Sequence, residues 1–232
     1  TWYNISDDNA NKVTRGDTVL AYISNGVVID IKSDDGTGAI PTNIAVVVGV
    51  GGDASVYGDQ VRLRYFDGTN KIVTLSDQND TDPAQGVAFR VSGSDTSIRL
   101  DELEEYSVNG KEYNGYQYQG TKKAADPTDG TINDVAVADD AVIILFTAGG
   151  QSKQITGKQF KALATTDLYD TAPNTPNTLE PGEAGAVFTK SVNGLNRVRL
   201  ASVMVADINI TGASNDNYAY VTSASYVNGD GN

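Results

Sequence analysis

The sequence contains no cysteine and no histidine, and methionine and tryptophan each occur once. Without cysteine, the chain has no disulfide, no thiol nucleophile and no thiolate metal site. Without histidine, it lacks the usual general base near neutral pH and the commonest ligand of transition metals. Hydrolysis by a Ser-His-Asp triad and zinc chemistry are therefore excluded, and we expect no enzymatic activity.

Long apolar runs and positive charge are also scarce. No stretch of about 18 apolar residues occurs, so we expect no helix that spans a membrane. The chain carries 17 basic and 30 acidic residues, which gives a formal net charge of −13. Such a surface repels nucleic acid and anionic lipid, so we expect neither as a partner. It suits a soluble extracellular protein and can attract divalent cations.

The feature that is abundant is the alternation of apolar and polar residues, which is typical of half-buried β-strands. The segment Asp17–Lys32, DTVLAYISNGVVIDIK, alternates on both sides of Asn25-Gly26, as a β-hairpin does. Helical spacing is confined to 100–105 and 158–164. The pattern predicts an all-β protein of antiparallel sheets, rolled into small barrels or packed as sandwiches.

Two segments look like second copies of earlier ones. RVRLASVMVADINI, from Arg197, resembles the first hairpin, and ILFTAGGQSKQITG (144–157) resembles LRYFDGTNKIVTL (63–75). Repeated patterns in compatible order favour duplicated modules. We therefore predict two tandem, related β modules, residues 1–103 and 104–232, with a long loop at 165–185 inserted in the second. The first module is expected to be incomplete at its N-terminus, because the chain reads as a piece of a longer polypeptide.

A family resemblance follows from the order of these strands. The segments that carry it are DTVLAYISNGVVIDI, IAVVVGVGGDASVYGDQVRLRYFDGTNKIVTL, VAFRVSGSDTSIRL and YSVNGKEYN. Together they resemble the β-repeat modules of S-layer proteins, the large Firmicutes surface proteins that carry S-layer homology domains. The resemblance covers most of 16–114 and, more faintly, 136–232. It does not include the helical motif with which that family anchors itself to the cell wall.

The resemblance implies an extracellular structural module at the bacterial cell surface. Its partners would be other copies or neighbouring domains of the same surface protein, and it would act through modular length and protein–protein contacts. The alternative is an adhesion or glycan-binding module that contacts cell-wall glycan. Tyr116 and Tyr118 would then stack on sugar rings from one face of a strand, together with the 165–185 loop. The same spacing also fits two tyrosines that pack against a neighbouring strand.

Acidic residues gather in two further places. Asp77, Asn79, Asp80 and Asp82 lie within SDQNDTD, and oxygen ligands of this kind can bind Ca²⁺. The order of an EF-hand is not met, and the same residues also suit solvated turns, where Asp and Asn bond to their own backbone. The second group, in DELEEY (101–106), is expected to lie on a solvated surface turn. Calcium at 77–82 is thus the one cofactor that the sequence suggests.

Overall fold

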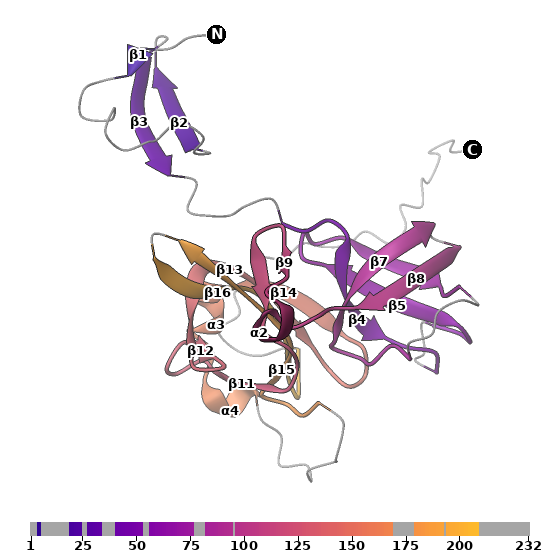
Figure 1. The fold of residues 1–232 in the computed structure, drawn as a ribbon. Coiled ribbons are helices and arrows are strands. Elements are labelled where there is room, and N and C mark those ends of the chain that lie inside the picture. Colours follow the sequence, from indigo (N-terminus) through magenta and orange to yellow (C-terminus); the bar gives the residue numbers. More distant parts are fainter. Residues whose placement is uncertain are drawn as a thin grey trace, which may run out of the picture.

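The ribbon in Figure 1 is a computed structural model that describes residues 4–5, 19–24, 27–33, 40–52, 56–76, 82–94, 96–168, 179–192 and 194–208. The prediction of an all-β protein is confirmed, since strands dominate these residues and each helix has four residues. The strands are β1 (Asn4–Ile5), β2 (Val19–Ser24), β3 (Val27–Ser33), β4 (Ile44–Gly49), β5 (Gln60–Tyr65), β6 (Asn70–Thr74), β7 (Ala88–Ser94), β8 (Ser97–Glu102), β9 (Glu112–Tyr113), β10 (Tyr116–Tyr118), β11 (Lys123–Asp126), β12 (Thr131–Ile132), β13 (Val135–Phe146), β14 (Ser152–Thr156), β15 (Glu183–Val192) and β16 (Leu195–Met204). The helices are α2 (Tyr106–Asn109), α3 (Gly157–Phe160) and α4 (Thr165–Leu168). No helix in these ranges is long and apolar enough to cross a membrane.

The N-terminal strands form a small sheet of their own. β2 and β3 pair antiparallel, which confirms the predicted hairpin, and β1 adds to β3 in parallel. This three-stranded sheet is drawn apart from the remaining strands in Figure 1. The range 1–103 therefore contains two separate sheets, one of them this hairpin sheet and the other a barrel.

The first barrel consists of β4 to β8. β4, β5 and β6 form an antiparallel meander, β7 returns to pair with β4, and β8 pairs with β7. This is the strand order of a Greek key. A parallel bridge between Leu75 and Ile98 joins the end of β6 to β8, and the Ser76 amide donates to the Ile98 carbonyl at 2.7 Å. These contacts close the five strands into a small barrel.

The second barrel repeats this order with β11, β12, β13, β15 and β16. β11, β12 and β13 form the meander, β15 returns to pair with β11, and β16 pairs with β15. β13 and β16 pair in parallel and close the ring, as β6 and β8 do in the first barrel. β14 adds to β13, and β9 and β10 add to the outer side of β15. Two tandem barrels with the same order of strand pairings are therefore present, while the division of the chain at residue 103 stays a prediction.

The segments that suggested the repeat do not occupy equivalent strands. The second half of the chain was expected to form a hairpin from Arg197 onward, and this prediction is wrong for the described residues. β16 is one strand that pairs with the preceding β15, and 205–208 form no strand. The other pair of segments does share a turn, since both Gly68 and Gly150 donate from positive φ to the residue three positions earlier. However, that turn joins β5 to β6 in one barrel and β13 to β14 in the other.

The two barrels pack against each other through their outer faces. In β4, Ala45 and Val47 point into the first barrel, whereas Val46 and Val48 belong to a second apolar cluster. That second cluster, which we call the junction core, also contains Phe146, Phe188 and Leu200 of the second barrel (the full buried set is Ile44, Val46, Val48, Phe66, Ala88, Tyr116, Tyr118, Ile144, Phe146, Ala186, Phe188 and Leu200). β4 and residues 141–146 of β13 thus pack on both sides, which explains why these two segments are continuous apolar runs.

Close backbone contacts hold the junction together. A Cβ atom on Gly185 would overlap the Gly86 carbonyl oxygen, and one on Gly86 would overlap the Phe146 ring. The buried Ser202 hydroxyl donates to that same Gly86 carbonyl at 2.7 Å. Gln85 Nε2 donates to the carbonyls of Val48 and Thr147, one from each barrel, at 2.9 Å. The segment before β7 therefore joins both barrels, and only glycine fits at the two closest points.

The short helices fill the interior of the second barrel. Thr156 caps α3 by a reciprocal capping box with Gln159, which fixes where the chain leaves β14. From this start, Phe160, Leu163 and Leu168 reach the interior cluster of the second barrel and are almost completely buried. The interior therefore consists of strand residues and a helical plug.

Candidate functional site: the pocket at the barrel junction

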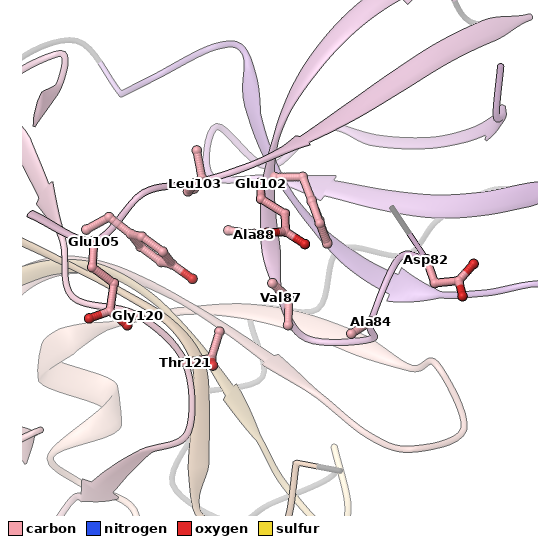
Figure 2. Close-up of a pocket in the computed structure, with 11 residues that line it drawn as sticks. Asp82, Ala84, Val87, Ala88, Glu102, Leu103, Glu105, Gly120 and Thr121 are labelled. Carbon is pink, nitrogen blue, oxygen red and sulfur yellow. The ribbon is translucent and has the colours of Figure 1, made fainter. Parts of the chain in front are cut away.

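A pocket of about 330 Å³ opens where the two barrels meet. Its walls come from the segment that leads into β7, from the end of β8 and from the segment after β10 (Asp82, Ala84, Val87, Ala88, Phe89, Glu102, Leu103, Glu105, Tyr118, Gly120 and Thr121). Figure 2 shows Glu102, Glu105 and Thr121 around this space, with Asp82 at the far side. The volume lies at the lower end of the range of small-molecule sites. We call it the junction pocket.

Glycine at position 120 makes room for one acidic wall of the pocket. Gly120 is buried and has a φ of 93°, a conformation that other residues rarely adopt. A Cβ atom at this position would overlap the carboxylate of Glu105. Glu105 itself stands immediately before α2, and Ser107 Oγ lies 3.5 Å from its Oε2. The turn around α2 and the absence of a side chain at 120 therefore place the Glu105 carboxylate at the pocket.

Tyr118 contributes a buried polar group to the same pocket. Only 4% of its surface is exposed, and its ring packs against Phe188 with 5.1 Å between ring centroids. Within the described part of the chain, its hydroxyl makes no hydrogen bond to another residue. Burial raises the pKa of Tyr118, and the negative charges of Glu105 and Glu102 and the nearby Tyr113 raise that pKa further. The electrostatic potential at the hydroxyl is therefore negative, which favours a positive group in the pocket.

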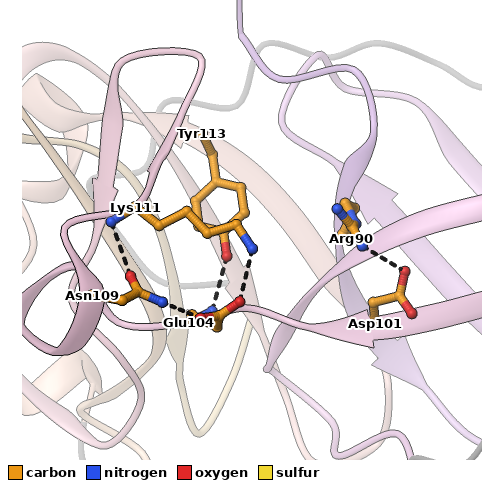
Figure 3. Close-up of polar contacts among 6 residues, drawn as sticks. All are labelled: Arg90, Asp101, Glu104, Asn109, Lys111 and Tyr113. Carbon is orange, nitrogen blue, oxygen red and sulfur yellow. Dashed lines mark hydrogen bonds and ion pairs between the residues drawn. The ribbon is translucent and has the colours of Figure 1, made fainter.

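A network of exposed polar contacts holds the turn that carries Glu105. Lys111 Nζ donates to Glu104 Oε1 at 2.8 Å, and Asn109 Nδ2 donates to the other oxygen of the same carboxylate. The Tyr113 hydroxyl accepts from the Glu104 amide at 2.9 Å (Figure 3). The hydrogen bond and the charge of Lys111 lower the pKa of Glu104, and Glu104 in turn raises the pKa of Lys111. This network fixes the backbone between β8 and β9.

The residues predicted to bind calcium can be followed only in part. Asp82 lines the junction pocket, whereas Asp77, Asn79 and Asp80 lie outside the described residues. In the portion of the chain that is described, no three acidic side chains are grouped closely enough to hold one metal ion. Calcium at 77–82 therefore stays a prediction.

The two tyrosines proposed as a glycan platform are buried. Tyr116 and Tyr118 lie on β10 with 2% and 4% of their surface exposed, and both belong to the junction core. Lys190 Nζ lies 5.0 Å from the centroid of the Tyr116 ring. A ring in this setting cannot offer its face to a sugar, so the surface-platform hypothesis is wrong and the packing alternative describes both residues. The reason is that β10 adds to β15 beneath the first barrel, which covers it.

The sequence did not identify Glu102 and Glu105 as part of a site. DELEEY was expected to be a solvated surface turn, and Glu102 and Glu104 are exposed, whereas Asp101 and Glu105 are half-buried. However, the end of β8 and the residues before α2 bring Glu102 and Glu105 into the same pocket as Asp82 and Thr121, which come from distant segments. The chemistry available there is that of carboxylates and hydroxyls over an apolar floor of Val87, Phe89 and Leu103. Such a site can bind a ligand that carries positive charge and an apolar part.

Comparison with known proteins adds no relative. No family model matches the chain, no curated protein matches it, and no solved structure matches it.

Proposed function

We propose that this chain is a structural module of an S-layer-like protein at the bacterial cell surface. It acts through modular length and contacts with other copies or neighbouring domains of the same surface protein, and it catalyses no reaction. The proposal is supported by the resemblance of residues 16–114 to the β modules of such proteins. It is also supported by the acidic composition, which suits an extracellular surface.

The observation that carries the proposal is the junction core between the barrels. Side chains from β4 and β7 of one barrel interdigitate with those of β13, β15 and β16 of the other. Close-packed protein interiors resist deformation, so two barrels joined through such a core behave as one stiff block. A module that sets spacing in a surface layer needs this stiffness, because a flexible joint would not keep neighbouring contacts in register.

The alternative of a glycan-binding module loses Tyr116 and Tyr118 as contact residues, since both are buried, whereas residues 169–178 of its 165–185 loop lie outside the described residues. A building block and an adhesin also differ in solution behaviour. Sedimentation velocity over a wide range of protein concentration, with and without calcium, should show reversible growth in mass for a building block. A constant monomer mass combined with saturable binding to purified cell-wall glycan would contradict the proposal and support an adhesin.

Calcium at the 77–82 segment is a separate part of the proposal. A ligand that binds only the folded state raises the melting temperature, and the increase grows with the logarithm of ligand concentration once this exceeds Kd. We expect calcium to raise the calorimetric melting temperature relative to chelator, and magnesium to have a smaller effect. The Asp82→Asn variant should lose part of this increase, while Asp67→Asn serves as a control for a turn aspartate elsewhere. An equal response of both variants would indicate a general ionic-strength effect.

A further inference from the structure

We propose that the junction pocket binds an alkylammonium group, with the carboxylates of Glu102 and Glu105 taking the ammonium and the apolar floor taking the alkyl chain. Of the 11 described residues that line it, three are acidic and none is basic. No described lysine or arginine forms an ion pair with Glu102 or Glu105. The pocket thus presents negative charge that is not neutralised by its own walls.

A second observation comes from Tyr118. Only 4% of the surface of Tyr118 is exposed, and its side chain lines the pocket. Its hydroxyl makes no hydrogen bond to any other described residue. The oxygen is open to the pocket, so a ligand there can supply the hydrogen-bond partner that the described residues do not. The oxygen lone pairs can accept a hydrogen bond from an ammonium group in the pocket. The negative charges that raise the pKa of Tyr118 attract the same cation.

The arrangement of carboxylates and apolar side chains around the pocket favours an organic cation over a metal ion. A metal needs several oxygens converging on one point, and no such group of acids exists among the described residues. Here the carboxylates line one side, and Val87, Phe89 and Leu103 line another. A primary ammonium on a short alkyl chain matches both surfaces, because its methylene groups can cover apolar side chains while its charged end pairs with carboxylates.

This chemistry has two sources. One is a free alkylamine, and the other is a lysine side chain on a second copy of the chain. The second source rests on the proposed function, since it would make the pocket a contact between copies. The first source does not depend on it.

The first experiment is an amide NMR titration with n-butylammonium chloride, with n-butanol and sodium butyrate as matched ligands of different charge. We expect saturable shifts at 87–89, 102–105 and 118–121 with n-butylammonium, and at least about fivefold weaker binding of the two other ligands. Equal affinity for n-butanol, or no saturable shift with n-butylammonium, would overturn the proposal.

Variants then assign the binding to these side chains. Glu102→Gln and Glu105→Gln should each weaken n-butylammonium binding about threefold to tenfold. Tyr118→Phe keeps the ring contact with Phe188 and should weaken binding about threefold without lowering the melting temperature. Glu112→Gln, an exposed acid on β9 outside the pocket, is the control and should bind as the parent does. If Glu102→Gln and Glu105→Gln both bind as the parent, the pocket is not the site.

The second experiment separates the two sources. Sedimentation velocity is measured with and without saturating n-butylammonium, on the parent chain and on the Glu102→Gln/Glu105→Gln double variant. If saturating n-butylammonium and the double substitution each abolish assembly, the occupant is a lysine of a second copy. If n-butylammonium binds and assembly does not change, the occupant is a free amine. A chain that binds n-butylammonium but never self-associates retains this inference and overturns the proposed function. A chain that self-associates but does not bind n-butylammonium retains the proposed function and overturns this inference.

Discussion

The two barrels have the same ring of strand pairings but close it with very different contacts. In the first barrel, one bridge between Leu75 and Ile98 joins β6 to β8. In the second barrel, β13 and β16 share a parallel ladder that runs from Val137↔Val198 to Phe146↔Met204. The difference follows from strand length, since β6 has five residues and β13 has 12. Strand order alone therefore does not determine how firmly a small barrel is sealed.

The barrels also differ in the segment that leads into the returning strand, β7 in the first barrel and β15 in the second. In the second barrel, α3 and α4 place Phe160, Leu163 and Leu168 inside. In the first barrel, the corresponding connection carries Gln85 and Gly86 to the junction and contributes no described helix. The segment before the returning strand therefore packs inside the second barrel, whereas in the first barrel it makes the contact between the two barrels.

The largest expected effect comes from removing the plug of the second barrel. Phe160 is fully buried, so Phe160→Ala should lower the free energy of unfolding by about 3–5 kcal/mol. Chemical denaturation followed by fluorescence and circular dichroism measures this. Lys158→Ala, on the exposed side of the same helix, should change stability by less than about 0.5 kcal/mol. A small effect of Phe160→Ala would mean that the second barrel does not depend on its plug.

The next effect tests the contact between the barrels. Gly185→Ala places a methyl group on the Gly86 carbonyl oxygen, which belongs to the backbone and cannot easily move. We expect a loss of about 2–3 kcal/mol in chemical denaturation, because overpacking of this kind forces backbone shifts. Gly149→Ala is the matched control, since its nearest neighbour is 3.9 Å away and its φ is not positive. Equal stability of the two variants would show that the backbone at Gly185 and Gly86 is not in close contact in solution.

The two similar turns provide a smaller and symmetrical test. Gly68 and Gly150 have φ values of 93° and 77° and occupy the same position in their three-residue turns. Alanine at either position should cost about 1–2 kcal/mol, because an L side chain is strained there. Similar losses in thermal or chemical melts would support equivalent turns. Gly149→Ala again provides the comparison, since it lies in one of these turns without positive φ.

The smallest effect concerns the exposed network beside the pocket. The hydrogen bond from Lys111 lowers the pKa of Glu104 below its ordinary value of 4.5, so its stabilising contribution is present above that pH. The contribution is lost as pH falls through the lowered pKa. In Lys111→Met, carbon-detected NMR should show Glu104 titrating at higher pH than in the parent chain. Lys122→Met is the control, and an unchanged Glu104 midpoint in Lys111→Met would show that the pair is absent in solution.

Much of the architecture could be predicted from residue patterns. Alternation identified most of the strands, although not β1, β11 and β12, and Asn25-Gly26 identified the N-terminal hairpin. The pattern did not identify which strands are buried on both faces. β4 and the last six residues of β13 (141–146) are continuous apolar runs, and only the packing of one barrel on the other explains them.

The repeat could have been found from a different pair of segments. Gly-Val-Ala-Phe at 86–89 and Gly-Ala-Val-Phe at 185–188 lie at the start of equivalent hairpins, β7–β8 and β15–β16. The likeness is shifted by one residue in the structure, because Phe89 points into the first barrel and Phe188 points to the junction. Since side chains alternate across a strand, a shift of one residue reverses the face. Sequence matching without coordinates cannot detect this reversal.

The candidate site was less accessible to sequence reasoning than the fold. Its acids come from Asp82 and from Glu102 and Glu105, which are separated along the chain and joined only by the junction. The two tyrosines looked like an exposed pair because β10 alternates, but β15 and the first barrel cover them. A pattern within one strand does not indicate whether another barrel covers that strand.

Local chemistry by itself determined that this chain is all-β, acidic, free of thiol and imidazole chemistry, and built from hairpins. These properties depend on residue type and on the period of two along a strand, which neighbours in sequence specify. Tertiary structure alone decided that the two barrels share an apolar core and that carboxylates from two distant segments line one pocket. These properties depend on contacts between residues far apart in sequence, whose positions follow from how whole barrels pack.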